Sequence, residues 1–312
     1  MNHNIIAIVG PTASGKTALS VRLAQELGGE IVSFDSMQLY RGMDIGTATP
    51  TQEEMAGIPH HMINVADPTE AYSVSRYVNQ ADPIMQELLA SGKPVILVGG
   101  TGLYVDSLVA GREFAPFPET GLREELMDKA EKEGILPLYE ALCLIDPEAG
   151  AAIHPSNHKR VIRAMEVYLE TGKTISQHNR ESREKPPKYQ PLWIGLDYVN
   201  REALYSRINR RVEKMFAEGL VQEVQGLLAQ GIPAEATAMQ AIGYKELVSH
   251  LRGETTEDEA KEAIALASRR YAKRQRTWFR RNEAVHWLEL PDRPNLDEIF
   301  LSARQILRDS PK

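Results

Sequence analysis

Cysteine is almost absent from this chain, because Cys143 is the single one among 312 residues. One cysteine excludes an intramolecular disulfide, and it excludes zinc fingers or ribbons built on paired cysteines. A protein without disulfides fits a reducing compartment. The sequence therefore predicts a cytoplasmic location.

Long apolar runs are also missing. The N-terminal run IIAIVG covers only residues 5–10, and no basic segment precedes it. No later run approaches the roughly 20 residues that a membrane-spanning helix needs. The sequence therefore predicts a protein that is neither secreted nor embedded in a membrane.

An excess of positive charge is missing as well, since the formal net charge is -7. This average argues weakly against a protein that coats nucleic acid indiscriminately, although local clusters count for more than the sum. A composition with 42% hydrophobic and 25% charged residues is typical of an ordinary globular protein. The length allows one large α/β domain with an insertion, or two modest domains.

Strands and helices alternate in the first third of the chain. A strand is expected at residues 4–9, a helix at 16–27, a second strand at 30–35, and a strand that leads through glycines into a helix at 93–104. This alternation predicts a parallel, doubly wound sheet. The elements expected later are strands at 191–198 and 284–290, helices at 201–231, 238–253 and 256–281, and a helix at the end.

Two proline clusters, at residues 114–118 and 185–191, are interpreted as domain hinges. Helices are expected between them at 119–134 and 157–173, and no strand pattern is evident there. The predicted organisation is a catalytic core domain formed by residues 1–113 and 191–312, with a small all-helical insertion domain at residues 114–190.

The strongest chemical signal is GPTASGKT at residues 10–17, which satisfies the phosphate-loop pattern G-x-x-x-x-G-K-[ST] in full. Backbone N–H groups of such a loop and the start of the next helix attract phosphate, Lys16 adds a charge, and the Thr17 hydroxyl can bind Mg²⁺. The alternative is a glycine-rich turn without a ligand, but the motif lies between a strand and a helix, as binding requires. The fold expected is an α/β, P-loop NTPase-like parallel sheet flanked by helices. The residues expected at the diphosphate are Gly10, Thr12, Ala13, Ser14, Gly15, Lys16 and Thr17.

The loop recognises a diphosphate but does not identify the group attached to it. An ATPase would carry an aspartate for Mg²⁺ at the end of a second strand, whereas the run VILVGGTG ends in glycine and threonine. No signature for guanine recognition is evident either. ATP is therefore only the default ligand.

Asp35 follows the second expected strand, and in a doubly wound sheet that edge faces the same crevice as the phosphate loop. Its carboxylate can act as a general base or bind a metal, or it can simply cap a turn. Thr101 follows another strand and would face the same crevice. Capping of the following helix is a strong alternative for Thr101, and both roles can hold at once.

Helical spacing places Arg207, Arg210, Arg211 and Lys214 along one stripe of the segment 201–217. One of these arginines could neutralise a departing diphosphate by bidentate hydrogen bonds. The stripe could equally be a solvated face paired with nearby glutamates.

Two segments are locally basic. Residues 269–281 carry seven basic residues and no acidic one, and residues 158–166 form a second cluster within the expected insertion. Two such faces would suit an RNA backbone, although a charge run is often merely solvated. The helical pattern predicts a buried stripe of Ile264, Ala267, Tyr271 and Trp278 beside a basic face, and in the insertion it predicts a buried side of Ile162, Met165 and Leu169.

Seven motifs in this order resemble the bacterial tRNA dimethylallyltransferases. They are GPTASGKT, DSMQLYRGMDIGTATP, HH at 60 and 61, VGGTGLY, RVIRAMEVYLETGKTIS, AIGYKEL and AKRQRTWFR. The likeness runs from about residue 4 to about residue 288. Many families share the phosphate loop, whereas GMDIGTA and KRQRTWFR at these separations are highly specific. Two positions differ from the common family pattern, Thr49 in place of lysine and Asn64 in place of aspartate.

The resemblance implies transfer of the dimethylallyl group from dimethylallyl diphosphate to N6 of the adenosine 3′ of the anticodon, in tRNAs that read codons beginning with U. It implies that Asp35 is the base, that Thr101 orients the amine, and that Mg²⁺ and the phosphate loop hold the diphosphate with help from Arg207. It also implies a monomer that binds the tRNA anticodon stem-loop. The residues implied to contact tRNA are Asp35, Ser36, Met37, Gln38, Thr101, Arg123, Lys159, Arg160, Val161, Ile162, Arg163, Lys273, Arg276 and Arg280.

Three other functions remain open from the residues. A P-loop kinase acting on a nucleoside or nucleotide would use Asp35 as a base on a hydroxyl and would turn over ATP. A prenyltransferase acting on free AMP or ADP would not need two separate basic faces. A non-catalytic RNA-binding module would use the loop only as a phosphate clamp, so Asp35→Ala would leave RNA binding intact.

Overall fold

The computed structural model describes residues 3–112 and 120–310, apart from the side chains of residues 183 and 184. The chain forms two compact units, Met1–Gly111 with Lys188–Lys312, and Arg112–Pro187. The proline cluster expected to act as a hinge at 114–118 lies outside the described residues. Each unit is described by itself below.

The first unit is built on a six-stranded sheet with the order β3-β2-β4-β1-β5-β6, in which every neighbouring pair is parallel. β1 and β5 are interior strands and are buried along their whole length, as continuous apolar runs in parallel sheets usually are. The predicted α/β fold is confirmed. The strands are β1 (Ile5–Val9), β2 (Glu30–Ser33), β3 (His60–His61), β4 (Val95–Val98), β5 (Leu192–Tyr198) and β6 (Val285–Leu290).

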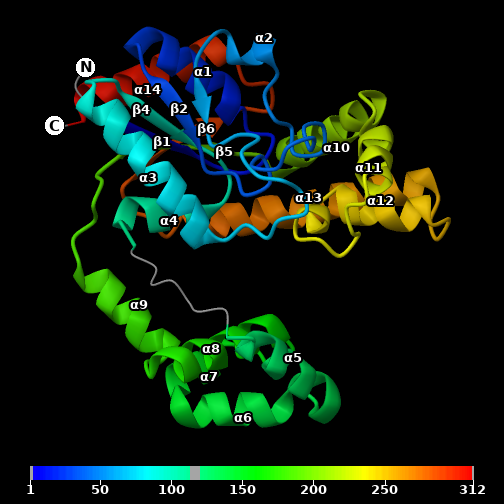
Figure 1. Cartoon of the computed structure of the whole chain (residues 1–312). Coiled ribbons are helices and arrows are strands. Elements are labelled where there is room, and N and C mark those ends of the chain that lie inside the picture. Colours follow the sequence, from blue (N-terminus) through cyan, green and yellow to red (C-terminus); the bar gives the residue numbers. More distant parts are fainter. Residues whose placement is uncertain (1–2, 113–119, 311–312) are drawn as a thin grey trace. The chain divides into compact units, whose positions relative to one another are not determined.

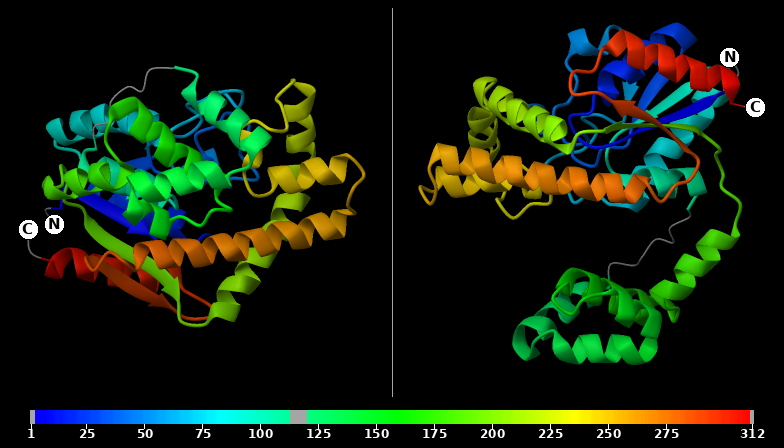
Figure 2. Two further views of the ribbon diagram at one scale, coloured as in Figure 1. Left: turned by 90° about the horizontal axis from the view of Figure 1, so that it is seen from below. Right: turned by 180° about the vertical axis from the view of Figure 1, so that it is seen from behind.

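Helices cover both faces of this sheet (Figures 1 and 2). α1 (Lys16–Leu27) packs beside α14 (Leu296–Asp309) on one face, and α3 (Val74–Ala90) packs with α4 (Gly102–Ala110) on the other. A long helix, α13, contacts both α10 and α12. The remaining helices of this unit are α2 (Gln52–Met55), α10 (Arg201–Ala217), α11 (Leu220–Ala229), the 3₁₀ turn η1 (Ala238–Gln240), α12 (Tyr244–Leu251) and α13 (Glu257–Phe279).

The ends of α1 follow from two glycines. Gly15 precedes the helix with φ 93° and Gly28 follows it with φ 64°, and both values lie in the left-handed region that favours glycine. The helix therefore occupies the residues predicted from the sequence. By contrast, the single helix predicted at 201–231 was wrong, because Gly219 with φ 100° separates α10 from α11.

The second unit contains α5 (Leu122–Glu133), α6 (Leu136–Ile145), α7 (Pro147–Ala152), α8 (His158–Thr171) and α9 (Ile175–Glu184). Its described residues contain no strand, in agreement with the prediction. Leu126, Leu142, Val161 and Met165 lie in its core. The prediction that Leu169 is buried was wrong, since this side chain near the end of α8 is 51% exposed.

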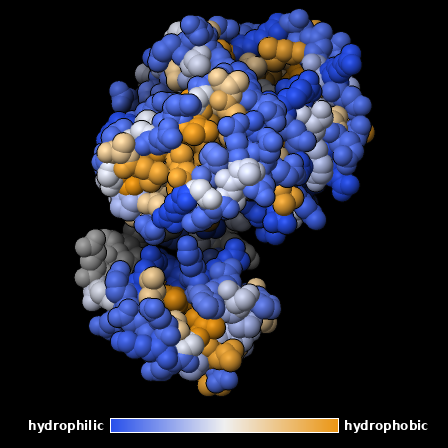
Figure 3. Space-filling view, turned by 90° about the vertical axis from the view of Figure 1, so that its right-hand side faces the viewer, coloured by the Kyte–Doolittle hydropathy of each residue, from blue (hydrophilic) through white to orange (hydrophobic). Residues whose placement is uncertain are grey.

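The surface is mainly hydrophilic, with apolar patches on both units (Figure 3). No helix among the described residues is long and apolar enough to cross a bilayer.

Candidate active site

The phosphate loop connects β1 to α1 at the carboxyl edge of the sheet. Gly10 is required there, because an added Cβ atom would lie 2.3 Å from the carbonyl oxygen of Leu196. Ala13 also has a positive φ, 63°, which curls the loop so that it leads into the helix. Ser14 is buried, and its hydroxyl bonds to no atom of the described residues. An unpaired buried donor in this loop suits an oxyanion ligand.

A cavity of about 440 Å³ lies over this loop. A second cavity of about 280 Å³ shares five lining residues with it, so the two meet. The shared residues are Thr12, Asp35, Thr47, Arg211 and Tyr271. The larger cavity is also lined by Ala13, Gly15, Lys16, Thr17, Gln38 and Arg207, all of which the sequence predicted at the site.

Lys16 lines the larger cavity, and its Nζ donates a hydrogen bond of 2.8 Å to the carbonyl oxygen of Pro11. Burial and, to a smaller extent, the nearby Arg211 lower the pKa of Lys16 from 10.5 to about 7, against the opposing effect of Asp35. Burial also lowers the pKa of Arg211, again against the effect of Asp35. An anion bound in the cavity would stabilise the charged forms of Lys16 and Arg211, which burial disfavours.

Asp35 lies between the two cavities, beyond the end of β2. Its Oδ1 accepts a hydrogen bond of 3.0 Å from the backbone N–H of Met37, so the carboxylate caps its own turn while it faces the cavity. The capping role and the cavity role considered from the sequence are therefore compatible.

Thr101 precedes α4 but does not cap it with its side chain. Its hydroxyl instead accepts a hydrogen bond of 3.0 Å from the backbone N–H of Ser36 and donates one of 3.1 Å to the Ser36 hydroxyl. Ser36 follows Asp35 directly. Thr101 thus supports the backbone beside the carboxylate.

The stripe on α10 lines the larger cavity, with Arg207, Arg210, Arg211 and Lys214 all on its wall. Arg207 is tied to the phosphate loop, because its Nε donates to the carbonyl oxygen of Ala13 at 3.1 Å. Arg211 lines both cavities and lies near Asp35. The stripe is therefore a cationic wall of the site rather than only a solvated face.

Sequence reasoning missed two residues of α13 that line the larger cavity. Gln275 is buried, its Oε1 accepts from the backbone N–H of Thr12 at 2.8 Å, and its Nε2 donates to the carbonyl oxygen of Gly100 at 3.1 Å. This N–H of Thr12 therefore points at Gln275, although it was expected to face the diphosphate. Tyr271 was expected in the core, yet it lines both cavities and donates to the carbonyl oxygen of Gly100 at 3.3 Å.

Arg276 and Arg280, predicted to contact tRNA, converge on one carboxylate. Both guanidinium groups donate to Oδ2 of Asp197 at 2.9 Å, and Asp197 is 2% exposed. Arg280 still exposes 54% of its side chain, and Lys273, seven residues earlier along α13, is exposed. These two side chains remain open to a ligand.

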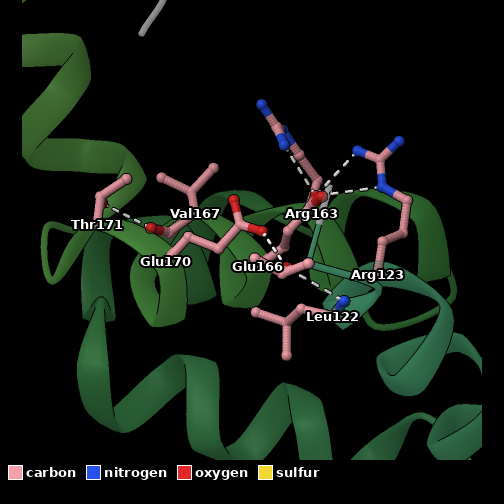
Figure 4. A network of polar contacts seen from close by, with 8 residues as sticks. Leu122, Arg123, Arg163, Glu166, Val167, Glu170 and Thr171 are labelled. Atoms are coloured by element: carbon pink, nitrogen blue, oxygen red, sulfur yellow. Dashed lines mark hydrogen bonds and ion pairs between the residues drawn. The ribbon is translucent and has the colours of Figure 1, made fainter. Parts of the chain in front are cut away.

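The second unit contains a similar arrangement, in which two arginines donate to one buried carboxylate. Arg123 of α5 and Arg163 of α8 both donate to Oε2 of the buried Glu166 (Figure 4). Lys159 and Arg160, at the start of α8, are exposed. The side chains of Val161 and Ile162 are buried in the core of this unit, so they present no surface to a polyanion.

The comparisons with known proteins agree with one another. Residues 38–282 match the family model described as IPP transferase, and residues 3–70 match one described as isopentenyl transferase. A tRNA dimethylallyltransferase of Caldanaerobacter subterraneus subsp. tengcongensis is 48% identical, with 96% of each chain covered. One of Geobacter sulfurreducens is 46% identical, with 95% of this chain and 94% of the relative covered.

Solved structures give the same result. The tRNA isopentenylpyrophosphate transferase of Bacillus halodurans matches with a TM-score of 0.73 and 42% identity over 98% of this chain and 96% of that one. A eukaryotic dimethylallyltransferase acting on tRNA matches with a TM-score of 0.83 and 28% identity over 98% of this chain and 80% of that one. The family expected from the motifs is confirmed, and this chain belongs to the IPP transferase family.

Proposed function

We propose that this protein transfers the dimethylallyl group of dimethylallyl diphosphate to N6 of the adenosine that follows the anticodon in tRNAs reading codons that begin with U. The observation that carries the proposal is the position of Asp35, which lines one cavity together with the phosphate loop and the cations of α10. The absence of an acidic residue directly after β4, where Gly99 and Gly100 stand, argues against an ATPase. The names of the relatives support a tRNA acceptor.

The reaction requires a good leaving group and a general base. The exocyclic amine of adenine is a poor nucleophile, because its lone pair is delocalised into the ring. As N6 forms a bond to the allylic carbon, the carbon–oxygen bond to the diphosphate breaks and its electron pair leaves with the diphosphate. Lys16 and Arg207 stabilise this departing charge, and the Asp35 carboxylate accepts the N6 proton that becomes acidic during attack. The products are N6-dimethylallyladenosine and diphosphate.

The donor set fits a Mg²⁺ ion that takes most of its ligands from the substrate. Among the described residues no group of three or more histidine, cysteine, aspartate or glutamate side chains could hold a metal by itself. Thr17 lines the cavity, and its hydroxyl oxygen would be a suitable ligand for magnesium held mainly by phosphate oxygens and water. When bound, Mg²⁺ would neutralise part of the diphosphate charge. Thr17 would then fix the position of the diphosphate relative to Lys16.

The tRNA contacts are proposed on each unit separately. In the first unit Lys273 and Arg280 would contact phosphates, and Gln38 beside Asp35 would contact the edge of the target base after it is flipped out of its loop. In the second unit Lys159, Arg160 and Arg163 on α8 and Arg123 on α5 would contact the backbone. The expectations of a monomer and of a cytoplasmic location stay predictions, and sedimentation of the purified protein checks the first.

The test is a transfer assay with radiolabelled dimethylallyl diphosphate, Mg²⁺ and an unmodified tRNA that carries adenosine after its anticodon. AMP and ATP serve as parallel substrates. We expect label in the tRNA, lost in Asp35→Ala while tRNA binding persists. Label in AMP alone would contradict the tRNA acceptor, and ATP hydrolysis without labelled RNA would favour the kinase. If Asp35→Ala transferred label at the wild-type rate, Asp35 would not be the base.

A further inference from the structure

The specific motif GMDIGTA covers residues 42–48, and the proposed chemistry assigns no role to the loop formed by its residues 43–48. Thr47 lines both cavities, Gly46 lines the smaller one and Ala48 the larger one. A loop that contributes to both cavities has to be held in place. Within the loop, the N–H of Ala48 donates to the carbonyl oxygen of Ile45 and the Thr47 hydroxyl donates to that of Met43, but these bonds do not connect the loop to the rest of the unit.

One carboxylate outside the loop supplies this support. Glu223 of α11 accepts hydrogen bonds from three successive backbone N–H groups, those of Asp44 and Ile45 at 2.8 Å and that of Gly46 at 3.1 Å. The hydroxyl of the buried Tyr244, in the motif AIGYKEL, donates to the same carboxylate at 2.5 Å. Four donors on one charged acceptor form a strong and geometrically specific anchor.

The opposite side of this loop holds residues of the site. The carbonyl oxygen of Ala48 accepts from Nε2 of Gln38 at 3.1 Å, while Oε1 of Gln38 accepts from the Ser33 hydroxyl at 3.1 Å. The carbonyl oxygen of Thr47 lies 3.5 Å from Nη2 of Arg211. The orientation of the Gln38 amide therefore depends on where the loop lies.

Resting on the proposed function, we propose that Glu223 and Tyr244 are positioning residues that hold the loop 43–48, and through it Gln38, for the acceptor base. Neither side chain lines the cavities among the described residues, so neither touches the reacting atoms. They act through the backbone of the loop. The substrate that depends on them is the tRNA, because Gln38 is the residue with the firmer bond to the loop.

Gly46 fits this role. An added Cβ atom at Gly46 would lie 2.4 Å from Cε2 of the Tyr244 ring. Any side chain there would push the loop off the ring that supports it. We therefore expect Gly46→Ala to reproduce the effect of losing Glu223.

The first test measures the loop itself, without substrate. In Glu223→Gln the side-chain amide places N–H groups against the N–H groups of the loop, and we expect amide exchange of residues 44–46 to become at least about tenfold faster. Glu259→Gln is the matched control, since Glu259 likewise accepts a backbone N–H and a hydroxyl hydrogen bond, both from Thr256, but lines neither cavity. Unchanged exchange in Glu223→Gln would overturn the anchor regardless of what reaction the protein performs.

The second test separates the two substrates. We expect Glu223→Gln to raise KM for tRNA about tenfold and to change KM for dimethylallyl diphosphate less than about twofold. Tyr244→Phe should have a weaker effect in the same direction. In a Gln38→Ala background, Glu223→Gln should add little, because both changes remove one function. Equal changes in both KM values, or full additivity with Gln38→Ala, would overturn the proposal. A wild-type protein without transfer activity would overturn the proposed function instead, while the exchange result would still stand.

Discussion

At the residue scale, the hydroxyl of Thr101 supports the backbone segment that carries the proposed base. It bonds to the backbone and to the side chain of Ser36, the residue after Asp35. Thr101→Val keeps the shape and loses both bonds, so we expect the transfer rate to fall about tenfold with tRNA affinity nearly unchanged. Thr101→Ser, which keeps the hydroxyl, is the control and should retain most of the activity. Single-turnover rates measure the effect, and equal losses in both variants would contradict this role.

Lys16 makes stability depend on pH. Burial lowers its pKa from 10.5 to about 7, so between these values the unfolded chain holds a proton that the folded chain has released. The free energy of unfolding therefore rises with pH through this window, and below about pH 7 the folded protein carries the buried charge at full cost. Lys16→Met removes that cost. We expect the variant to exceed wild type in stability by about 2 kcal/mol at pH 6, a value reduced because the cavity is open to solvent.

Urea unfolding at pH 6, 8 and 9.5 measures this difference, which should shrink as the pH rises. Lys214→Met is the control, since Lys214 lines the same cavity but is exposed. A stability difference that stays constant with pH would contradict the assignment to Lys16.

The residues of the site that could be predicted are those marked by a local pattern. The phosphate loop has a fixed spacing, and Asp35 and Thr101 follow strands, so their places at one edge of a parallel sheet follow from the fold. Gln275 has no such mark. Its two partners, Thr12 and Gly100, are 263 and 175 residues away, and neither bond is visible in one sequence.

At the element scale, Gln275 ties α13 to the phosphate loop and to the segment after β4. Gln275→Leu would leave the N–H of Thr12 and the carbonyl of Gly100 without this partner in a buried place. We expect a loss of about 2–4 kcal/mol of stability and weaker binding of inorganic diphosphate. Calorimetry measures both quantities.

Gln305→Leu is the matched control, because Gln305 is exposed and Asp309, four residues later in α14, accepts its hydrogen bond. A loss of stability in Gln275→Leu without any change in diphosphate affinity would mean that the helix is a structural support only.

The elements that were predicted well have strong local signals. α1 is bounded by two glycines with positive φ, and β1 is a continuous apolar run. α3 was not anticipated, and Pro83 lies inside it. β3 has only two residues, and it exists because it pairs with β2 rather than through its own propensity. Tyr271 was predicted to point inward, and it does, but it lines the cavities rather than the core. The helical period identifies the inward face of a helix, but it does not distinguish a core position from a cavity wall.

At the scale of the whole molecule, two buried carboxylates fix arginines in the two units. Asp197 holds Arg276 and Arg280 in the first unit, and Glu166 holds Arg163 and Arg123 in the second. The basic runs read from the sequence are therefore partly neutralised. The family and the class of enzyme predicted from the motifs are confirmed, but the number of cations open to tRNA is smaller than the count of basic residues suggested.

The salt dependence of the tRNA binding constant K measures how many cations each unit contributes to phosphate contacts. A plot of log K against log salt concentration has a negative slope, and each phosphate contact that is lost reduces the magnitude of this slope by about one. We expect Lys159→Ala with Arg160→Ala in the second unit to lower the slope for tRNA by about two, and Lys273→Ala in the first unit to lower it by about one. The affinity for dimethylallyl diphosphate should stay unchanged in all of these variants.

Lys129→Ala with Lys132→Ala is the matched control, because these exposed lysines belong to α5 of the second unit but lie outside the predicted contacts. Filter binding of one unmodified tRNA at four salt concentrations gives every slope. If the Lys159 and Arg160 pair left the slope unchanged, while Lys273→Ala lowered it, tRNA binding would rest on the first unit. If the control pair lowered the slope as much as the tested pair, the second unit would attract tRNA by its overall charge and not through the start of α8.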